Sequence, residues 1–454
     1  TLQILAQGLS DAGVPVFCAD VKGDLSGIAA MGAPGEKMQK RAAHMGLTLT
    51  PAAAPVVFWD LFGEQGHPIR ATISEMGPLL ISRMLELNDV QEGVMTVVFR
   101  AADDEGLLLL DLKDLQAALA YTAENAKALG AKYGNVSSAT VATIQRKLLV
   151  LEDQGGAQLF GEPALQLSDL MRTDGAGRGY VNVLAADKLI ASPRLYATFL
   201  LWLMSELFEE LPEVGDPEKP RLAFFFDEAH LLFRDAPKAL LEKVEQVVRL
   251  IRSKGVGIYF VTQNPADIPE AVLGQLGNRM QHALRAYTPV EQRGLRAAAG
   301  SFRPNPAFDT AEAIQGLGVG EALVSVLDEK GSPTMVERTL IRPPVSRLGP
   351  LSPAERAQVM AQSPVRGLYD EAEDRESAYE TLKAKAEQAA APAPARRAPS
   401  PAPWGAEAAP QPRARASSRQ GMAETLAKSV LRTVGNQIGR ELMRGVLGGL
   451  KRRR

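Results

Sequence analysis

Residues 221–233 read RLAFFFDEAHLLF, and this stretch decides the fold. Five of its first six residues are apolar, and two adjacent acids, Asp227 and Glu228, follow directly. A short unbroken apolar run is typical of a strand buried on both faces, as in a parallel sheet covered by helices. Side chains at the carboxyl end of such a strand emerge where α/β folds bind their ligands. The stretch therefore predicts a buried parallel strand with a candidate ligand site at its end.

Four other segments repeat this pattern, and helical patterns separate several of them. The apolar runs are VPVFCAD (14–20), PVVFWD (55–60), GYVNVLAAD (179–187) and GIYFVTQ (257–263). The helical patterns include 193–211 and 235–254. This alternation is typical of an α/β domain with a mostly parallel sheet. In addition, residues 321–341 predict a hairpin that turns at Gly331.

The chain divides by composition into six segments. We expect an α/β core in two parts, interrupted by a helical insertion and followed by three C-terminal segments. In order, these are 1–74 (first part of the core), 75–175 (helical insertion), 176–345 (second part of the core), 346–390 (polar and helical), 391–418 (a disordered Pro/Ala/Arg linker) and 419–454 (an amphipathic basic helix).

Charge and cysteine content narrow the class of protein. The 454 residues are nearly neutral at −2, yet residues 391–454 carry 13 Lys and Arg against 3 Glu, so they are net +10 and the rest is net −12. Any attraction to polyanions is therefore expected in the tail. Cys18 is the single cysteine, which excludes an internal disulfide. No apolar run is long enough to span a bilayer, and we expect a cytoplasmic protein without a transmembrane segment.

Polar residues at the ends of three predicted strands suggest a nucleotide site. Asp227 is suited to hold Mg²⁺ and Glu228 to orient a water against a phosphate, although both acids also favour a helix start. Gln263 is placed to sense a terminal phosphate, or else it is a turn residue before Pro265. Three parallel strands would bring such groups into one crevice.

The third of these strands ends at Asp20 and leads into a tight turn. Asp20, Lys22 and Asp24 surround Gly23, and we interpret the three side chains as contacts for the nucleotide. A polar surface turn at a sheet edge would show the same residues.

Four arginines complete the set of candidates. Arg249 and Arg252 lie three residues apart before the strand that ends at Gln263, and Arg279 and Arg285 follow it. In ring-forming ATPases an arginine from one subunit reaches the γ-phosphate bound by its neighbour. For any single one of the four, a solvated side chain or a helix C-terminal charge is the favoured explanation.

Several motifs together resemble the HerA/FtsK-type P-loop ATPases. They are DVKGDLSG, PVVFWDLFGEQGHPIR, FFFDEAHLLF, RLIRSKGVGIYFVTQNP and the hairpin with VERTLIRPP, and they cover about residues 1–345. The chain is most similar to the bacterial family with a helicase HerA-like C-terminal domain. The resemblance implies a RecA-like P-loop NTPase core, ATP and Mg²⁺ as ligands, and a hexameric ring related to DNA-pumping motors.

The resemblance also implies roles for individual residues. Asp227 matches the Walker B acid that holds magnesium and Glu228 the catalytic base. Gln263 matches the sensor, and Arg249 and Arg252 match the arginines before the sensor strand.

One motif of these ATPases is missing from the sequence. The phosphate-binding loop GxxxxGK[ST] occurs nowhere, and GAPGEKM (32–38) has the wrong spacing. The chain starts without Met on a helix of the kind that follows this loop. We expect a truncated sequence that is inactive as given, with natural loss of the motif as the alternative.

Two functions and two uses of the tail remain open. The first function is an ATP-driven DNA helicase or translocase, and the second is a nucleotide-dependent scaffold or switch without translocation. The basic C-terminal helix is expected to dock on its own ring or on a partner, with DNA or membrane contact as the second interpretation.

Overall fold

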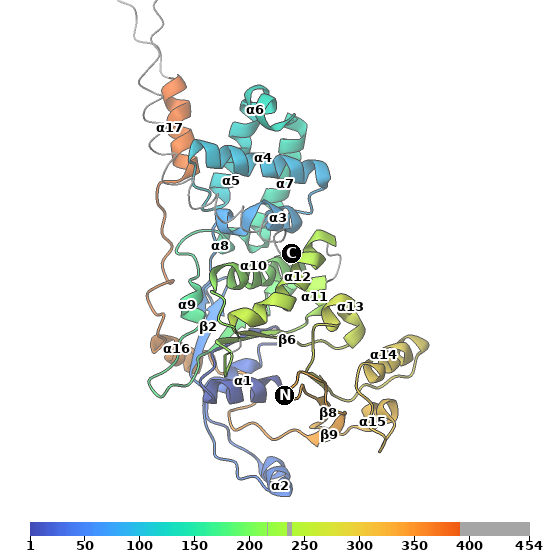
Figure 1. The fold of residues 1–454 in the computed structure, drawn as a ribbon. Coiled ribbons are helices and arrows are strands. Elements are labelled where there is room, and N and C mark those ends of the chain that lie inside the picture. Colours follow the sequence, from blue (N-terminus) through green and yellow to red (C-terminus); the bar gives the residue numbers. More distant parts are fainter. Residues whose placement is uncertain (216, 234–237, 391–454) are drawn as a thin grey trace, which may run out of the picture. The chain divides into compact units, whose positions relative to one another are not determined.

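The computed structural model describes residues 1–215, 217–233 and 238–390, and these contain a six-stranded parallel sheet (Figure 1). The strand order is β3-β2-β4-β1-β5-β6. Its strands are β1 (Val16–Asp20), β2 (Val56–Asp60), β3 (His67–Pro68), β4 (Val181–Ala185), β5 (Leu222–Phe226) and β6 (Val256–Phe260). The predicted α/β class with a mostly parallel sheet is confirmed. The predicted linker (391–418) and basic helix (419–454) lie outside the described residues.

Alternating side chains of the strands build a core on each face of the sheet. Phe17 and Phe224 stack at 4.6 Å on the face covered by α10 (Pro193–Glu210) and α12 (Lys238–Leu250). Cys18 and Phe225 belong to the opposite face, which α1 (Leu2–Asp11) and α16 (Pro353–Ala361) cover. Burial on both sides explains why the strands read as unbroken apolar runs rather than alternating ones.

Helices fill the chain between β3 and β4. They are α3 (Ile73–Met84), α4 (Asp89–Glu105), α5 (Leu112–Glu124), α6 (Ala126–Tyr133), α7 (Ser138–Leu151), the π-helical turn Glu152–Gly156, α8 (Ala157–Leu159) and α9 (Leu167–Leu170). Helix α3 packs against α4 and α10, and α5 packs against α7. Local signals define several starts, because Thr72, Asn88 and Asp111 each form a capping box. The region is helical, as its pattern predicts.

A second, antiparallel sheet follows the parallel one. Its order is β7-β8-β9, with β7 (Arg279–Gln281), β8 (Glu321–Ser325) and β9 (Glu337–Leu340). The predicted hairpin is β8–β9, and its turn contains Gly331 at φ +74°. The hydropathy pattern does not predict β7, which is only three residues long.

Short elements connect these layers. They are η1 (Leu25–Ala29), α2 (Glu36–His44), η3 (Leu189–Ala191), α11 (His230–Phe233), η4 (Ile251–Lys254), η5 (Pro265–Asp267), α13 (Glu270–Leu273), α14 (Pro289–Gly300) and α15 (Thr310–Gly316). No helix within the described ranges is long and apolar enough to cross a membrane.

Residues 346–377, here called the returning segment, run back from the second sheet to the core and the insertion. The Ser346 hydroxyl donates to Gln7 Oε1 at 2.8 Å, and the Tyr369 hydroxyl donates to Asp169 Oδ2 at 2.5 Å. The segment then leads into α17 (Ala378–Ala390), which packs on α5. The sequence predicts a polar helical segment over 346–390, and within it the structure forms helix at α16 and α17, whereas residues between them bind polar groups of distant elements.

Candidate functional site

The loops after β5 and β6 are held side by side at the carboxyl edge of the parallel sheet. Ala229 N donates to Val261 O at 2.9 Å, and Val261 N donates to Phe226 O at 2.8 Å. Between these bonds Glu228 takes a left-handed conformation, with φ 50°. A residue other than glycine rarely adopts this conformation, and such strain is concentrated at functional sites. The backbone thus turns sharply where the two acids leave the strand.

The Glu228 carboxylate lies where three neighbouring strands end. Gln263 Nε2, from the loop after β6, lies 3.1 Å from Glu228 Oε1 and 3.3 Å from Oε2. Lys22 Nζ, from the turn after β1, lies 3.9 Å from Oε1. Glu228 is only 6% exposed, whereas the Lys22 side chain is 66% exposed. The predicted convergence of Glu228, Gln263 and Lys22 is therefore present in the structure.

Asp227 precedes Glu228 and is half-buried. Its Oδ1 accepts from Glu228 N at 3.0 Å, and its backbone carbonyl accepts from the Tyr196 hydroxyl at 2.9 Å. Burial raises the pKa of the Asp227 carboxyl. The hydrogen bond from Glu228 N lowers this pKa, whereas the negative charge of Glu228 raises it further. At the start of the following helix, Leu231 N and Leu232 N donate to the backbone carbonyls of Glu228 and Ala229.

Asp20 lies at the same edge, but its carboxylate is bound by backbone. Gly23 N donates to Oδ1 at 2.8 Å, and Leu25 N donates to Oδ2 at 3.0 Å. Gly23 has φ +73°, as this tight turn requires. Burial raises the pKa of Asp20 to about 6, even though the Leu25 N–H favours the ionised form. Asp20 thus fixes the turn that carries Lys22 and the exposed Asp24.

Arg249 and Arg252 lie at the opposite, amino-terminal edge of the sheet. Arg249 pairs with Glu245 near the end of α12, and Arg252 lies in η4, just before β6. The adjacent Ser253 O accepts from Val214 N at 2.8 Å, in the connection that leads into β5. At about 3.3 Å per residue, the whole length of the five-residue β6 separates these arginines from Gln263. Both side chains are exposed.

Arg279 and Arg285 belong to the second sheet and its connections. Arg279 donates to Ser301 O and, at 3.3 Å, to Leu273 O, and its burial lowers its pKa. Arg285 donates to Leu317 O at 3.2 Å. Both therefore bind backbone carbonyls of this region, and the structure does not place either beside Glu228.

Two further residues, His230 and Tyr196, contact the two acids, and the strand pattern of the sequence does not predict either contact. His230 Nδ1 lies 3.3 Å from Glu228 Oε2. Its signal is its place two residues after Glu228 in DEAH. Tyr196 comes from α10, 31 positions before Asp227, and only the packing of α10 on β5 brings the two together. Burial strongly raises the pKa of the Tyr196 phenol, so it stays a neutral donor.

The solved structures that this chain is similar to include those of TrwB and VirB4. The bacterial conjugative coupling protein TrwBdeltaN70 shares 12% identity, with 78% of this chain and 83% of that chain covered and a TM-score of 0.49. TrwB in complex with ADP and Mg²⁺ shares 13%, with 78% and 84% covered and a TM-score of 0.46. VirB4 of Thermoanaerobacter pseudethanolicus shares 13%, with 76% and 86% covered and a TM-score of 0.47. These values do not bear on what this chain binds.

Family membership rests on the sequence as a whole. No curated protein matches the chain. The family model described as "Helicase HerA-like C-terminal" matches residues 1–454, which is the entire chain. The protein therefore belongs to the helicase HerA-like C-terminal family, a family of nucleotide-binding P-loop ATPases.

Proposed function

We propose that this protein hydrolyses ATP to drive movement along DNA, as a helicase or translocase motor. The observation that carries the proposal is the contact of Glu228 with Gln263 and Lys22, at the ends of three adjacent parallel strands. An acid, an amide and a lysine in one crevice suit phosphoryl transfer, because this reaction needs an oriented water and positive charge near the phosphates.

The residues present fit a magnesium ion held mainly by its nucleotide. Mg²⁺ keeps several waters and typically takes one or two protein carboxylates besides the phosphates. Asp227 supplies one such carboxylate, and no group of three or more metal-ligating side chains occurs within the described residues. Asp227 would hold the ion, which would neutralise negative charge on the bound nucleotide.

Glu228 is the proposed general base that accepts a proton from the attacking water. Gln263 donates to the Glu228 carboxylate, so it can hold this group in place and report the presence of a terminal phosphate. Lys22 and Asp24 extend from the turn that Asp20 fixes, and we propose them as nucleotide contacts, with Asp20 as the residue that positions the turn.

The arginines fit a function between subunits better than within one. Arg249 and Arg252 lie a full strand length from Glu228 in the same chain, so they would act on nucleotide bound by a neighbour in a homo-oligomeric ring, proposed to be a hexamer. Arg279 and Arg285 would then shape the subunit surface through the backbone carbonyls they bind.

The decisive experiment combines Glu228→Gln with DNA-stimulated ATP turnover. In a protein that also carries the phosphate-binding loop GxxxxGK[ST], we expect double-stranded DNA to stimulate ATP turnover, and Glu228→Gln to lower turnover by a factor of about 10²–10⁴ while ATP still binds. Glu92→Gln, at a half-buried position of α4, removes the same charge outside the site and serves as the control.

Two outcomes would decide against the proposal. Unchanged turnover in Glu228→Gln would remove Glu228 from catalysis. ATP turnover that depends on Glu228 but ignores DNA would favour the alternative, a nucleotide-dependent scaffold or switch.

A further inference from the structure

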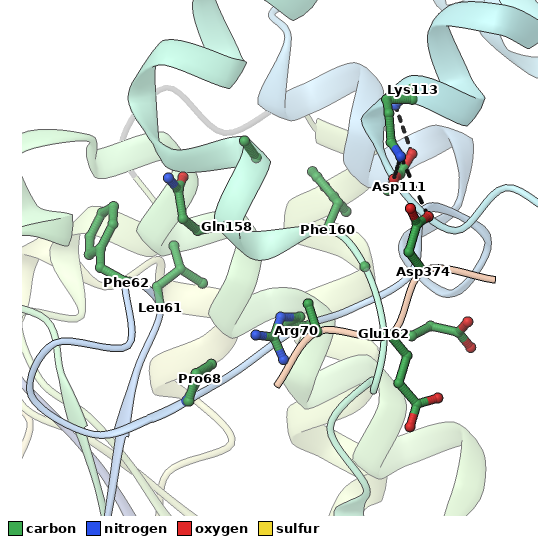
Figure 2. A pocket seen from close by; sticks show the side chains of 14 residues that line it. Leu61, Phe62, Pro68, Arg70, Asp111, Lys113, Gln158, Phe160, Glu162 and Asp374 are labelled. Atoms are coloured by element: carbon green, nitrogen blue, oxygen red, sulfur yellow. Dashed lines mark hydrogen bonds and ion pairs between the residues drawn. The ribbon is translucent and has the colours of Figure 1, made fainter. Parts of the chain in front are cut away.

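Two cavities border the helical insertion, and their charges differ. Figure 2 shows the first, of about 370 Å³, where Lys113 reaches both Asp111 and Asp374. The Lys113 Nζ distances to these carboxylates are 3.4 and 3.6 Å. Arg70, the other cation of this lining, donates to Tyr369 O at 2.9 Å. The described lining of this cavity carries four carboxylates, Asp111, Glu162, Glu373 and Asp374, against these two cations.

The second cavity, here called the basic cavity, has a volume of about 460 Å³. It lies between the end of α3, α7, the start of α10 and α11. Its described lining contains three cationic side chains, Arg83, Lys147 and Arg194, against one carboxylate, Glu86. Glu86 pairs with Arg194, and Lys147 donates to the backbone carbonyl of Glu86. The lining therefore keeps an excess of positive charge.

Arg83 is the most confined of these cations. Its Nη2 donates to Leu232 O at 3.3 Å, whereas its buried Nη1 has no hydrogen-bond partner among the described residues. Burial lowers the pKa of Arg83 to about 10, and the neighbouring charge of Arg194 acts in the same direction. Two guanidinium groups facing one cavity, with a buried N–H unpaired, are unfavourable unless an acceptor is present.

The amino terminus of α10 adds to this positive field. Ser192 and Pro193 line the basic cavity, and Ser192, the N-cap residue, makes no side-chain capping hydrogen bond. The first N–H groups of this 18-residue helix carry the positive end of its dipole. Oxyanions bind such termini readily, above all beside arginine.

We propose that the basic cavity binds a small molecule through a phosphate or diphosphate group. Arginine forks and a helix terminus match the oxygens of such a group, and the volume suits a small ligand. Arg83 bonds to Leu232, four residues after Glu228, so occupancy would also be felt in the loop of the catalytic acids. This regulatory consequence rests on the proposed function; the binding itself does not.

Calorimetric titration of the full-length protein with pyrophosphate, without magnesium and at low ionic strength, tests the binding. We expect the double variant Lys147→Ala/Arg194→Ala, at a half-buried and an exposed position respectively, to lower affinity about tenfold or more. Arg83→Gln should act alike. Arg146→Ala is the matched control, because Arg146 neighbours Lys147 on α7 but bonds to Thr143 and does not line the cavity.

The outcomes separate this site from the catalytic one. Unchanged affinity in the double variant would overturn the proposal, as would an equal loss in Arg146→Ala, which would indicate general surface charge. If the variants weaken binding of a single-stranded oligonucleotide but not of pyrophosphate, the cavity contacts nucleic acid instead and the small-ligand proposal fails. Glu228→Gln should leave pyrophosphate binding intact whether or not the proposed motor activity is correct.

Discussion

β1 and β5 are parallel neighbours in the sheet, and an acidic residue stands at the carboxyl end of each. These are Asp20 on β1 and the pair Asp227 and Glu228 directly after β5, and their carboxylates are bound differently. Backbone N–H groups of the following turn bind both carboxylate oxygens of Asp20. Side chains from two other strands and from His230 surround the carboxylate of Glu228. A position at the end of a strand therefore does not show whether an acid serves a ligand site or holds a turn. The groups that face its carboxylate show this.

The end of β2 supports this interpretation. Asp60 is buried, and its carboxylate accepts from the N–H groups of Phe62, Glu64 and Gln65 at 3.0, 2.8 and 2.8 Å. It fixes a turn in the same manner as Asp20. An acid whose two oxygens are both bound by its own loop has little capacity left for a ligand, whereas side chains from neighbouring loops lie beside the Glu228 carboxylate.

The largest expected difference is in magnesium-dependent ATP affinity. Asp227→Asn should weaken it by a factor on the order of 100 or more, because the lost charge faces the proposed metal. Asp20→Asn should change this affinity much less, since its oxygens serve the turn. Titration of both variants with ATP, with and without Mg²⁺, checks this. An equal loss of magnesium-dependent ATP affinity in the two variants would contradict the proposed difference between the acids of β1 and β5.

A second difference is in the pH dependence of stability. The folded pKa of Asp20 is raised to about 6, so the folded state holds its proton more tightly than the unfolded chain. Its contribution is therefore full at acidic pH and is lost as pH rises toward 6. Relative to Asp20→Asn, the wild type should lose roughly 2 kcal/mol of unfolding free energy between about pH 4.5 and 7.5. Denaturant melts of both proteins measure it, and parallel pH profiles would contradict it.

The smallest expected effect concerns the amide beside Glu228. Gln263→Ala should lower ATP turnover about tenfold, because one charge-assisted hydrogen bond that orients the base is lost. Gln275→Ala, exposed after α13, provides the control. Steady-state turnover and ATP affinity should be measured together, since loss of affinity alone would assign Gln263 to binding rather than to the base.

The sequence predicts the sheet well because its evidence is local. The apolar runs at 14–20, 221–228 and 257–263 contain β1 and β5 and most of β6, and the pattern at 193–211 contains α10. Burial on both faces leaves a signal that a few consecutive residues carry on their own. The short β7 has no such signal, since its pairing with β8 is what makes it a strand.

The candidate site is predictable only where strand order alone brings residues together. Parallel neighbours bring Lys22, Glu228 and Gln263 to one edge, so their meeting follows from the pattern. The contact of Tyr196 with Asp227 depends on how α10 packs, and the saturation of Asp20 depends on the path of its turn. The same parallel topology places Arg252 at the far edge, although its short sequence distance from Gln263 suggests proximity.

The returning segment has a consequence for synthesis on the ribosome. His67 bonds to Asp370 across 303 positions, and Gln7 bonds to Ser346 across 339. At about 5–20 residues per second, the early partners wait roughly 15–60 seconds for the late ones to be translated. During that interval the buried ring of His67 lacks its bond to Asp370, and the Asp169 carboxylate, although Arg172 already binds it, lacks the bond from Tyr369 for most of the same time. The nascent core therefore contains unpaired polar groups until the returning segment has been translated. The speed of translation sets how long this state lasts.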